Sequence, residues 1–273
     1  MREIGCIVSF GDHAPDAVAQ MAAAGFTLCQ IKCRMSRDYQ DAEIDALAAA
    51  LKTHGMRAVS LLCAHSGPAV WDLVEGPETL GIVPPAYRAQ RVKELERASD
   101  IAARLGISRV ITHVGFLPDD ARDPRYRDTV DVLRELCASF AKRGQRLLME
   151  TGQETPDVLL RALRDVGAEN LGVNFDCANL VMYGKADPVD ALRILGAYVK
   201  GVHAKDGVYP TDAVSLGQEM PLGEGRVDFD ALLALLDEIG YRGELIIERE
   251  TAPEQRFADV LKARAFLLAR IKP

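Results

Sequence analysis

The chain has 273 residues, of which 48% are hydrophobic and 27% are charged, and its formal net charge is −7. This composition excludes a disordered protein, and no apolar run approaches the ~20 residues of a membrane helix. Because an acidic protein repels phosphate backbones, we expect neither nucleic acid nor a membrane as a partner. The length fits one domain over residues 1–273, since α/β barrels run to ~250 residues as a unit.

Strand and helix patterns alternate through the first half of the chain. The apolar runs predict strands at Glu3–Phe10, Leu28–Arg34, Arg57–Ala64 and Arg109–His113. The helical patterns that follow them lie at Pro15–Ala24, Asp41–His54, Pro85–Leu105 and Pro124–Arg143. A long loop, His65–Pro84, contains the only tryptophan, Trp71. Its side chain could cover a bound sugar, or it could pack in the core or at an interface.

The second half repeats the alternation four more times. Two strands end at Glu150 and Asp176, and two more are expected at Val199–His203 and Glu244–Glu248. The helices are expected at Pro156–Val166, Pro188–Leu195, Phe229–Ile239 and Ala252–Ile271, with a long irregular loop at Ala204–Val227. The strands are continuously apolar, as parallel strands buried on both faces are. Eight βα units, with helices closed by glycine, predict a single (β/α)8 TIM barrel.

Three further features bear on the expected fold and on its cellular compartment. A doubly wound open sheet is the alternative fold, but the first strand is not followed by the G-x-G-x-x-G turn typical of it. The start, MREIGCIVSFGDHAPD, lacks the long apolar region of a signal peptide, so we expect a cytoplasmic protein. The six cysteines form no C-x-x-C pair, and we expect them to be buried and free: Cys6, Cys29, Cys33, Cys63, Cys137 and Cys177.

Four predicted strands end in a residue that can bind a metal. Glu150, Asp176 and His203 follow one another at intervals of 26 and 27 residues, close to the ~30 residues of a βα unit. Glu248 comes 45 residues later, which fits one unit plus a long loop. The carboxyl ends of barrel strands meet at one mouth, so these side chains are expected to converge there. They suit one divalent cation, with Mn²⁺ favoured and Mg²⁺, Co²⁺ or Zn²⁺ as alternatives, while salt bridges to Arg or Lys are the structural alternative.

Other polar residues are expected at the same mouth. His65 and His113 follow the third and fourth strands, and each suits either contact with substrate oxygens or a structural hydrogen bond. Lys205 and Asp206, in HAKDG, suit ion pairs within their loop as well as a ligand contact.

The segments METGQET, NFDCANLVMYG, VHAKDG, PLGEGRVDF and LIIERE resemble those of the sugar phosphate isomerase/epimerase family, the xylose isomerase-like TIM barrels. This family includes ketose 3-epimerases, hydroxypyruvate isomerase, inosose dehydratase and an endonuclease IV branch. The resemblance implies one divalent metal bound by Glu150, Asp176, His203 and Glu248. It also implies that Glu150 and Glu248 act as an acid/base pair on opposite faces of the substrate, and that the protein forms a homodimer or homotetramer.

The chain departs from the ketose 3-epimerases at two positions. A histidine usually stands three residues after the metal aspartate, where this chain has Asn179, and an arginine six residues after the metal histidine, where it has Tyr209. Asn179 can still form hydrogen bonds, and Gln153 and Glu154 are candidates for holding substrate hydroxyls. Because no basic residue beside Gln153 and Glu154 forms a phosphate clamp, an unphosphorylated sugar is favoured.

These observations predict a metal-dependent isomerase or epimerase that acts on a small sugar through an enediolate. A dehydratase of the inosose or dehydroshikimate type on the same scaffold is the first alternative, because it begins with the same proton abstraction. An endonuclease IV-like DNA repair enzyme fits less well, given Asn179 and the net charge of −7. A sugar-binding protein without catalysis is the remaining alternative.

Overall fold

Eight parallel strands close into a barrel in a computed structural model that describes residues 2–271. The hydrogen-bonded order around the barrel is β1-β10-β7-β6-β5-β4-β3-β2. The predicted TIM barrel is therefore confirmed. Its strands are β1 (Ile4–Ser9), β2 (Leu28–Arg34), β3 (Arg57–Ala64), β4 (Arg109–Thr112), β5 (Arg146–Glu150), β6 (Leu171–Asp176), β7 (Val199–Ala204) and β10 (Leu245–Ile247).

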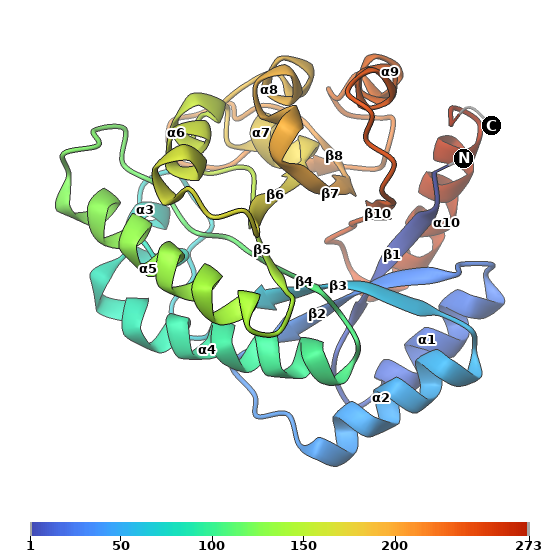
Figure 1. The fold of residues 1–273 in the computed structure, drawn as a ribbon. Coiled ribbons are helices and arrows are strands. Elements are labelled where there is room, and N and C mark those ends of the chain that lie inside the picture. Colours follow the sequence, from blue (N-terminus) through green and yellow to red (C-terminus); the bar gives the residue numbers. More distant parts are fainter. Residues whose placement is uncertain (1, 272–273) are drawn as a thin grey trace.

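Helices surround the strands on all sides of the barrel (Figure 1). They are α1 (Ala14–Ala23), α2 (Asp41–Thr53), α3 (Gly76–Thr79), α4 (Pro85–Arg104), α5 (Pro124–Ala141), α6 (Pro156–Val166), α7 (Cys177–Met182), α8 (Pro188–Leu195), α9 (Phe229–Glu238) and α10 (Pro253–Leu268), with a 3-10 turn at Gly196–Tyr198. Several begin with a capping side chain followed by proline. Asp123, Thr155 and Asp187 accept hydrogen bonds from backbone N–H groups of the first turn. The proline that follows each cap lacks the N–H that would stay unsatisfied there.

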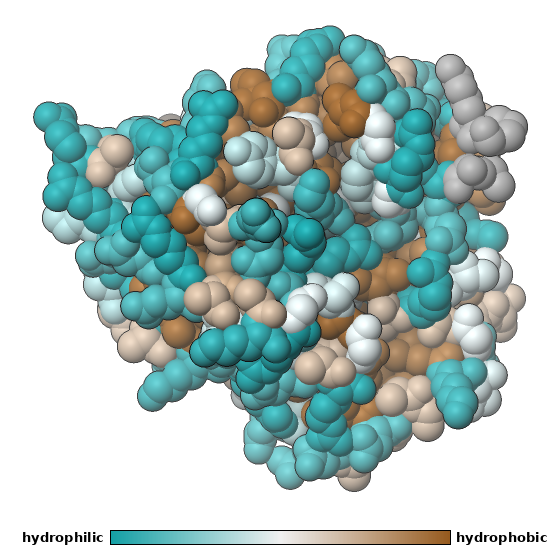
Figure 2. Space-filling model, in the orientation of Figure 1, coloured by the Kyte–Doolittle hydropathy of each residue, from teal (hydrophilic) through white to brown (hydrophobic). Residues whose placement is uncertain are grey.

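Most of the buried apolar side chains lie between the strands and the helices. A separate small cluster is formed by Leu62, Ile111 and Leu148, from three neighbouring strands. All six cysteines are buried and free, as predicted. Burial raises the pKa of Cys29 and of Cys137 to about 12, so these thiols are inert at neutral pH. On the outside, hydrophilic side chains cover much of the face shown in Figure 2, with hydrophobic ones in separate patches between them. Within residues 2–271, no helix combines the length and hydropathy needed to cross a membrane.

The sequence-based assignment differs from the structure mainly in the loops at the mouth. The segment after β6, which carries no predicted helix, forms the six-residue helix α7. The loop after β7 contains two short antiparallel strands, β8 (Asp206–Gly207) and β9 (Glu219–Met220). Gly196 does not adopt a left-handed conformation after α8, because its φ is −50° and it begins the 3-10 turn. Elements of two to six residues depend on tertiary contacts, so periodicity does not reveal them.

Two long loops meet above the barrel. Asp72, in the loop after β3, forms an antiparallel bridge with Ser215, in the loop after β7. The N–H of Leu73 donates to the carbonyl of Val214 at 2.8 Å. In the barrel order, β3 and β7 are separated by three strands on either side. The two loops therefore join opposite sides of the mouth.

A stability prediction follows from Gly81, in the loop that carries Trp71. Gly81 has a φ of +70°, and a Cβ there would lie 2.0 Å from the carbonyl oxygen of Val114. Gly55 is a matched control, because its φ is +62° and a Cβ there meets nothing within 4 Å. We expect Gly55→Ala to lower the free energy of unfolding by ~1 kcal/mol through strain alone. Gly81→Ala should cost at least ~2 kcal/mol more through overlap. Equal losses in urea denaturation would contradict this reading of Gly81.

Candidate metal centre

Four strand ends bring their polar side chains to one point. Glu150 ends β5, Asp176 ends β6, His203 lies in β7 and Glu248 follows β10. Each offers one ligand atom, and these atoms all lie within 4.8 Å of one another. All four residues are buried, with exposed fractions of 5% or less. A buried group of three carboxylates and one imidazole could hold a metal ion.

His203 occupies the middle of this group. Its Nδ1 lies 2.9 Å from Glu150 Oε1, 3.1 Å from Glu248 Oε2 and 3.5 Å from Asp176 Oδ2. Its Nε2 lies 3.0 Å from Nε2 and 3.2 Å from Oε1 of Gln30, in β2, and that Oε1 accepts a hydrogen bond from Ser60, in β3, at 2.9 Å. When the ring donates from its Nε2 to Gln30 Oε1, the Nδ1 lone pair is left for a cation. Neither Gln30 nor Ser60 was among the predicted site residues, because a buried amide and hydroxyl carry no sequence signal.

Two carboxylate oxygens support the fit to a cation. Glu150 Oε2 and Asp176 Oδ2 are buried and have no hydrogen-bond partner within residues 2–271. The other oxygen of Asp176 is used, because Oδ1 accepts a hydrogen bond from the backbone N–H of Asn179 at 2.8 Å and so caps α7. Buried polar atoms without partners are costly in a folded protein. These two oxygens face only imidazole nitrogens, at 3.4 Å from His113 Nε2 and 3.5 Å from His203 Nδ1. Together with the mixed nitrogen and oxygen donors of the group, they suit a divalent cation.

The charges of the group shift its protonation equilibria in opposite directions. Burial alone would lower the pKa of His203, but Coulombic attraction from Glu150 and Glu248 outweighs it and raises that pKa well above its usual value. Burial would raise the pKa of Glu248, yet Lys205 and His203 hold it well below its usual range. For Asp176, burial prevails and raises the pKa. In the absence of a cation, the imidazolium of His203 partly neutralises the carboxylates.

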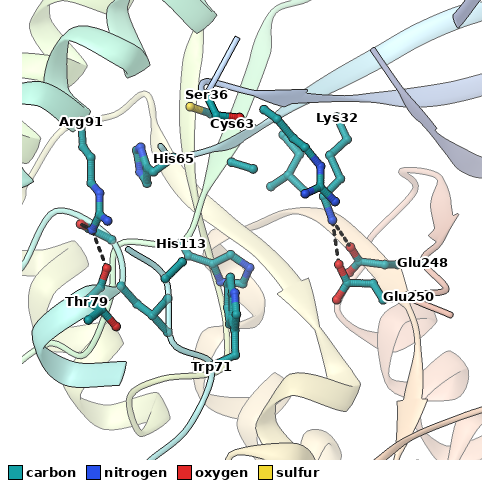
Figure 3. Close-up of a pocket in the computed structure, with 16 residues that line it drawn as sticks. Lys32, Ser36, Cys63, His65, Trp71, Thr79, Arg91, His113, Glu248 and Glu250 are labelled. Carbon is teal, nitrogen blue, oxygen red and sulfur yellow. Dashed lines mark hydrogen bonds and ion pairs between the residues drawn. The ribbon is translucent and has the colours of Figure 1, made fainter. Parts of the chain in front are cut away.

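Two lysines also approach Glu248. Lys205 Nζ lies 3.4 Å from Glu248 Oε2 and 3.1 Å from Glu250 Oε2. Lys32, in β2, lies 2.7 Å from Glu250 Oε1 and 3.8 Å from Glu248 Oε1 (Figure 3). These contacts fix the orientation of Glu248, and they favour its charged form.

A cavity of about 420 Å³ opens beside the group. Glu248 lines this cavity directly, while Trp71 and His113 form another part of its wall (Figure 3). Trp71 is 50% exposed, and its ring meets that of His113 edge-on with centroids 5.1 Å apart. Trp71 is therefore a cavity residue and not a core residue. The volume lies within the range of small-molecule sites.

The two predicted histidines both reach the cavity but differ in their contacts. Both nitrogens of His65 face protein groups, with Nδ1 3.2 Å from Glu94 Oε2 and Nε2 2.9 Å from Thr112 Oγ1. His113 accepts a hydrogen bond at Nδ1 from Gln153 at 3.0 Å, and its Nε2 lies 3.4 Å from Glu150 Oε2. His113 is thus better placed than His65 to contact a ligand near the carboxylates.

The remaining predicted contacts lie outside the lining of this cavity. Lys205 is 3% exposed and is engaged by carboxylates, and Asn179 is 5% exposed within α7. Glu154 is also buried, and burial raises its pKa to about 8. Asp206 accepts four backbone N–H groups, from Gly207, Gly223, Gly225 and Val227, and so holds the loop after β7. Its role is structural.

Comparison with known proteins identifies the fold family. The family model described as "Xylose isomerase-like TIM barrel" matches residues 18–269. The chain belongs to this family. A solved structure, the xylose isomerase domain protein from Planctomyces limnophilus, is 33% identical and superposes with a TM-score of 0.89, covering 98% of this chain and 96% of that one. A xylose isomerase-like TIM barrel protein from Mycobacterium smegmatis, in complex with magnesium, is 20% identical with a TM-score of 0.70, covering 93% and 87%.

Several curated proteins are similar in sequence. L-ribulose-5-phosphate 3-epimerase UlaE of Salmonella paratyphi C is 30% identical over 207 residues, which is 70% of this chain and 68% of the relative. Inosose dehydratase of Geobacillus thermodenitrificans is 22% identical over 293 aligned positions, covering 98% and 91%. The uncharacterized protein MJ1311 of Methanocaldococcus jannaschii is 26% identical over 67% of this chain, and the match spans 64% of that relative.

The contact between Gln30 and His203 generates a prediction about metal affinity. We expect Gln30→Ala to weaken Mn²⁺ binding by ~10- to 100-fold, because the ring of His203 loses the partner that fixes its orientation. Isothermal titration calorimetry measures the dissociation constant. Gln255→Ala, at an exposed position in α10, should leave it unchanged. An unaltered Mn²⁺ affinity in folded Gln30→Ala protein would show that the amide does not support the site.

A pH prediction follows from Glu94, the partner of His65. Burial would raise the pKa of Glu94, but hydrogen bonds from His65, Ser66 and Gln90 lower it from 4.5 to about 2. A carboxylate with a depressed pKa stabilises the fold above its unfolded pKa, and this contribution is lost as the pH falls toward 2. Glu94→Gln should therefore be less stable than wild type at pH 7, and the difference in the free energy of unfolding should shrink between about pH 5 and pH 2.

Urea denaturation at several pH values measures that difference. Glu135→Gln, at an exposed position in α5, is the matched control and should show no such trend. A stability difference between Glu94→Gln and wild type that does not change with pH would contradict the assignment.

Proposed function

We propose that the chain is a divalent-metal-dependent sugar isomerase or epimerase in which Glu150 and Glu248 exchange a proton with the substrate. The observation that supports this most is the position of these two carboxylates, which approach His203 Nδ1 from β5 and β10 at 2.9 and 3.1 Å. Two other strands, β6 and β7, separate β5 from β10 in the barrel, so the carboxylates can flank a small ligand. The names of the relatives, an epimerase and a dehydratase, agree with chemistry at a carbon next to a carbonyl.

Each protein group has a defined task in this proposal. Glu150, Asp176, His203 and Glu248 would hold the cation, which when bound stabilises negative charge developing on the substrate carbonyl oxygen. Lys32 and Lys205 keep Glu248 as a carboxylate that can accept a proton. His113, whose Nε2 faces Glu150, orients the other carboxylate. Trp71 excludes water from one side of the cavity.

A dehydratase would use the same carboxylates. After the first proton transfer, the substrate would lose a β-hydroxyl group as water. An epimerase would instead return the proton to the opposite face of the same carbon. A dehydratase is the second candidate function, because the chain is 22% identical to inosose dehydratase over 98% of its length. Of the earlier expectations, Mn²⁺ as the native metal, the cytoplasmic location and the dimer or tetramer stay predictions.

Substitution of the two glutamates tests the proposal. We expect Glu150→Gln and Glu248→Gln, each saturated with Mn²⁺, to lose at least ~100-fold in turnover, because each lacks one of the two proton carriers. Incubation with ketoses and keto-inositols in D₂O, followed by NMR and mass spectrometry, measures deuterium incorporation, epimer formation and loss of water. Glu169→Gln, at an exposed position, is the control. Turnover like that of the wild type in either glutamine variant refutes the acid/base assignment, and loss of water in place of epimer formation selects the dehydratase.

A further inference from the structure

The cavity wall carries more positive than negative charge, although the whole chain is acidic. Three cationic side chains line it, Lys32, Arg34 and Arg91, against two carboxylates, Glu248 and Glu250. One of those carboxylates, Glu248, also belongs to the candidate metal site. The charge left in the cavity therefore attracts an anionic ligand more than a neutral one.

Two of the three cations are already engaged by the protein. Lys32 donates to Glu250 at 2.7 Å (Figure 3). Arg91 is 1% exposed, and its guanidinium donates to the backbone carbonyls of Ser66, Pro68, Thr79 and Gly81. Only the backbone of Arg34 has hydrogen bonds within residues 2–271, and its guanidinium pairs with no carboxylate there. Arg34 is thus the cation of this cavity whose charge is left for a ligand.

The position of Arg34 along β2 places it farther from the candidate metal site than Lys32. Alternate residues of a strand share one face, so Gln30, Lys32 and Arg34 point the same way. Gln30 contacts His203, and Lys32 contacts Glu248 and Glu250. Arg34 lies two residues after Lys32, ~7 Å farther along the strand and nearer the rim of the barrel. A sugar with its carbonyl end beside Glu248 therefore extends its other end toward Arg34.

The backbone of Arg34 is held rigidly. The phenol oxygen of Tyr39 accepts a hydrogen bond from the N–H of Arg34 at 2.8 Å. Tyr39 is 1% exposed and stacks on Phe10 with ring centroids 4.4 Å apart. The neighbouring arginine, Arg37, is bound to Asp12 and Glu43 and does not compete for a ligand. A guanidinium presented from a fixed strand end suits two-point binding of an anion.

We infer that Arg34 is an anion-binding residue of this cavity, and that the substrate carries a phosphate or a carboxylate at the end remote from the candidate metal site. This inference rests on the proposed function for the orientation of the sugar. It departs from the sequence-based expectation of an unphosphorylated sugar, which weighed only the residues next to Glu150. The barrel brings β2 to the same cavity as Glu248, and sequence spacing did not reveal this.

Paired sugars test the inference with the Mn²⁺-loaded protein. Isothermal titration calorimetry gives dissociation constants for ribulose and ribulose 5-phosphate, and for fructose and fructuronate, so that each neutral sugar has an anionic match. In the wild type, we expect at least one anionic sugar to bind ~10- to 100-fold more tightly than its neutral match, as charge-assisted hydrogen bonds allow. The phosphate pair and the carboxylate pair show which anion is preferred.

Variants assign that preference to Arg34. In Arg34→Met, the ratio of the two affinities should fall toward one, and in Arg34→Lys it should be partly retained. Arg127→Met makes the same change in net charge at an exposed position of α5 and should keep the wild-type ratio. The inference is overturned if the wild type binds none of the four sugars, if it shows no preference for an anionic sugar, or if Arg34→Met keeps the preference.

Turnover of the same sugars separates this inference from the proposed function. An Arg34-dependent preference in binding without any product leaves the anion site standing and removes the isomerase. Product formation from neutral and anionic sugars alike, with equal affinities, leaves the isomerase standing and removes the anion site.

Discussion

The close approach of three buried carboxylates to one imidazole is the constraint on which the rest of the structure depends. Their ligand atoms lie within 4.8 Å of one another at the mouth of the barrel. Where water is excluded, like charges at this distance repel strongly, so the fold must place positive charge beside them. Without a cation, His203 in its protonated form and the ammonium of Lys205 supply this charge. A divalent cation would take the place of the proton on His203 Nδ1 and would bind Glu150 Oε2 and Asp176 Oδ2, which have no hydrogen-bond partner among residues 2–271.

The barrel brings the four candidate ligands together, and it places different side chains beside His203 and beside Glu248. On one side, Gln30 holds His203 and fixes the nitrogen that faces the carboxylates. On another, Lys32 and Lys205 hold Glu248 beside the cavity. The loops after β3 and β7 meet above the mouth through Asp72 and Ser215. A ligand therefore meets a charged wall near Glu248 and an aromatic wall near Trp71.

Much of the fold and the candidate ligands could be predicted because they rest on local patterns. Strands such as β2 and β3, and helices such as α6, have the predicted bounds, since buried apolar runs and proline or glycine signals mark their ends. The candidate ligands follow from polar residues at the ends of predicted apolar strands: Glu150, Asp176, His203 and Glu248. Gln30, Ser60 and Arg34 could not be found in this way. Their importance depends on which strands are neighbours around the barrel and on which side chains are left without partners, and neither is encoded in spacing along one chain.

The most direct measurement is anomalous diffraction from crystals grown with one equivalent of Mn²⁺. We expect a single anomalous peak enclosed by Glu150, Asp176, His203 and Glu248, within ~2.3 Å of one atom from each, as ligand distances for such ions require. A fully occupied peak elsewhere in the barrel, or clear density for the four side chains with no peak among them, would show that they do not form a metal site.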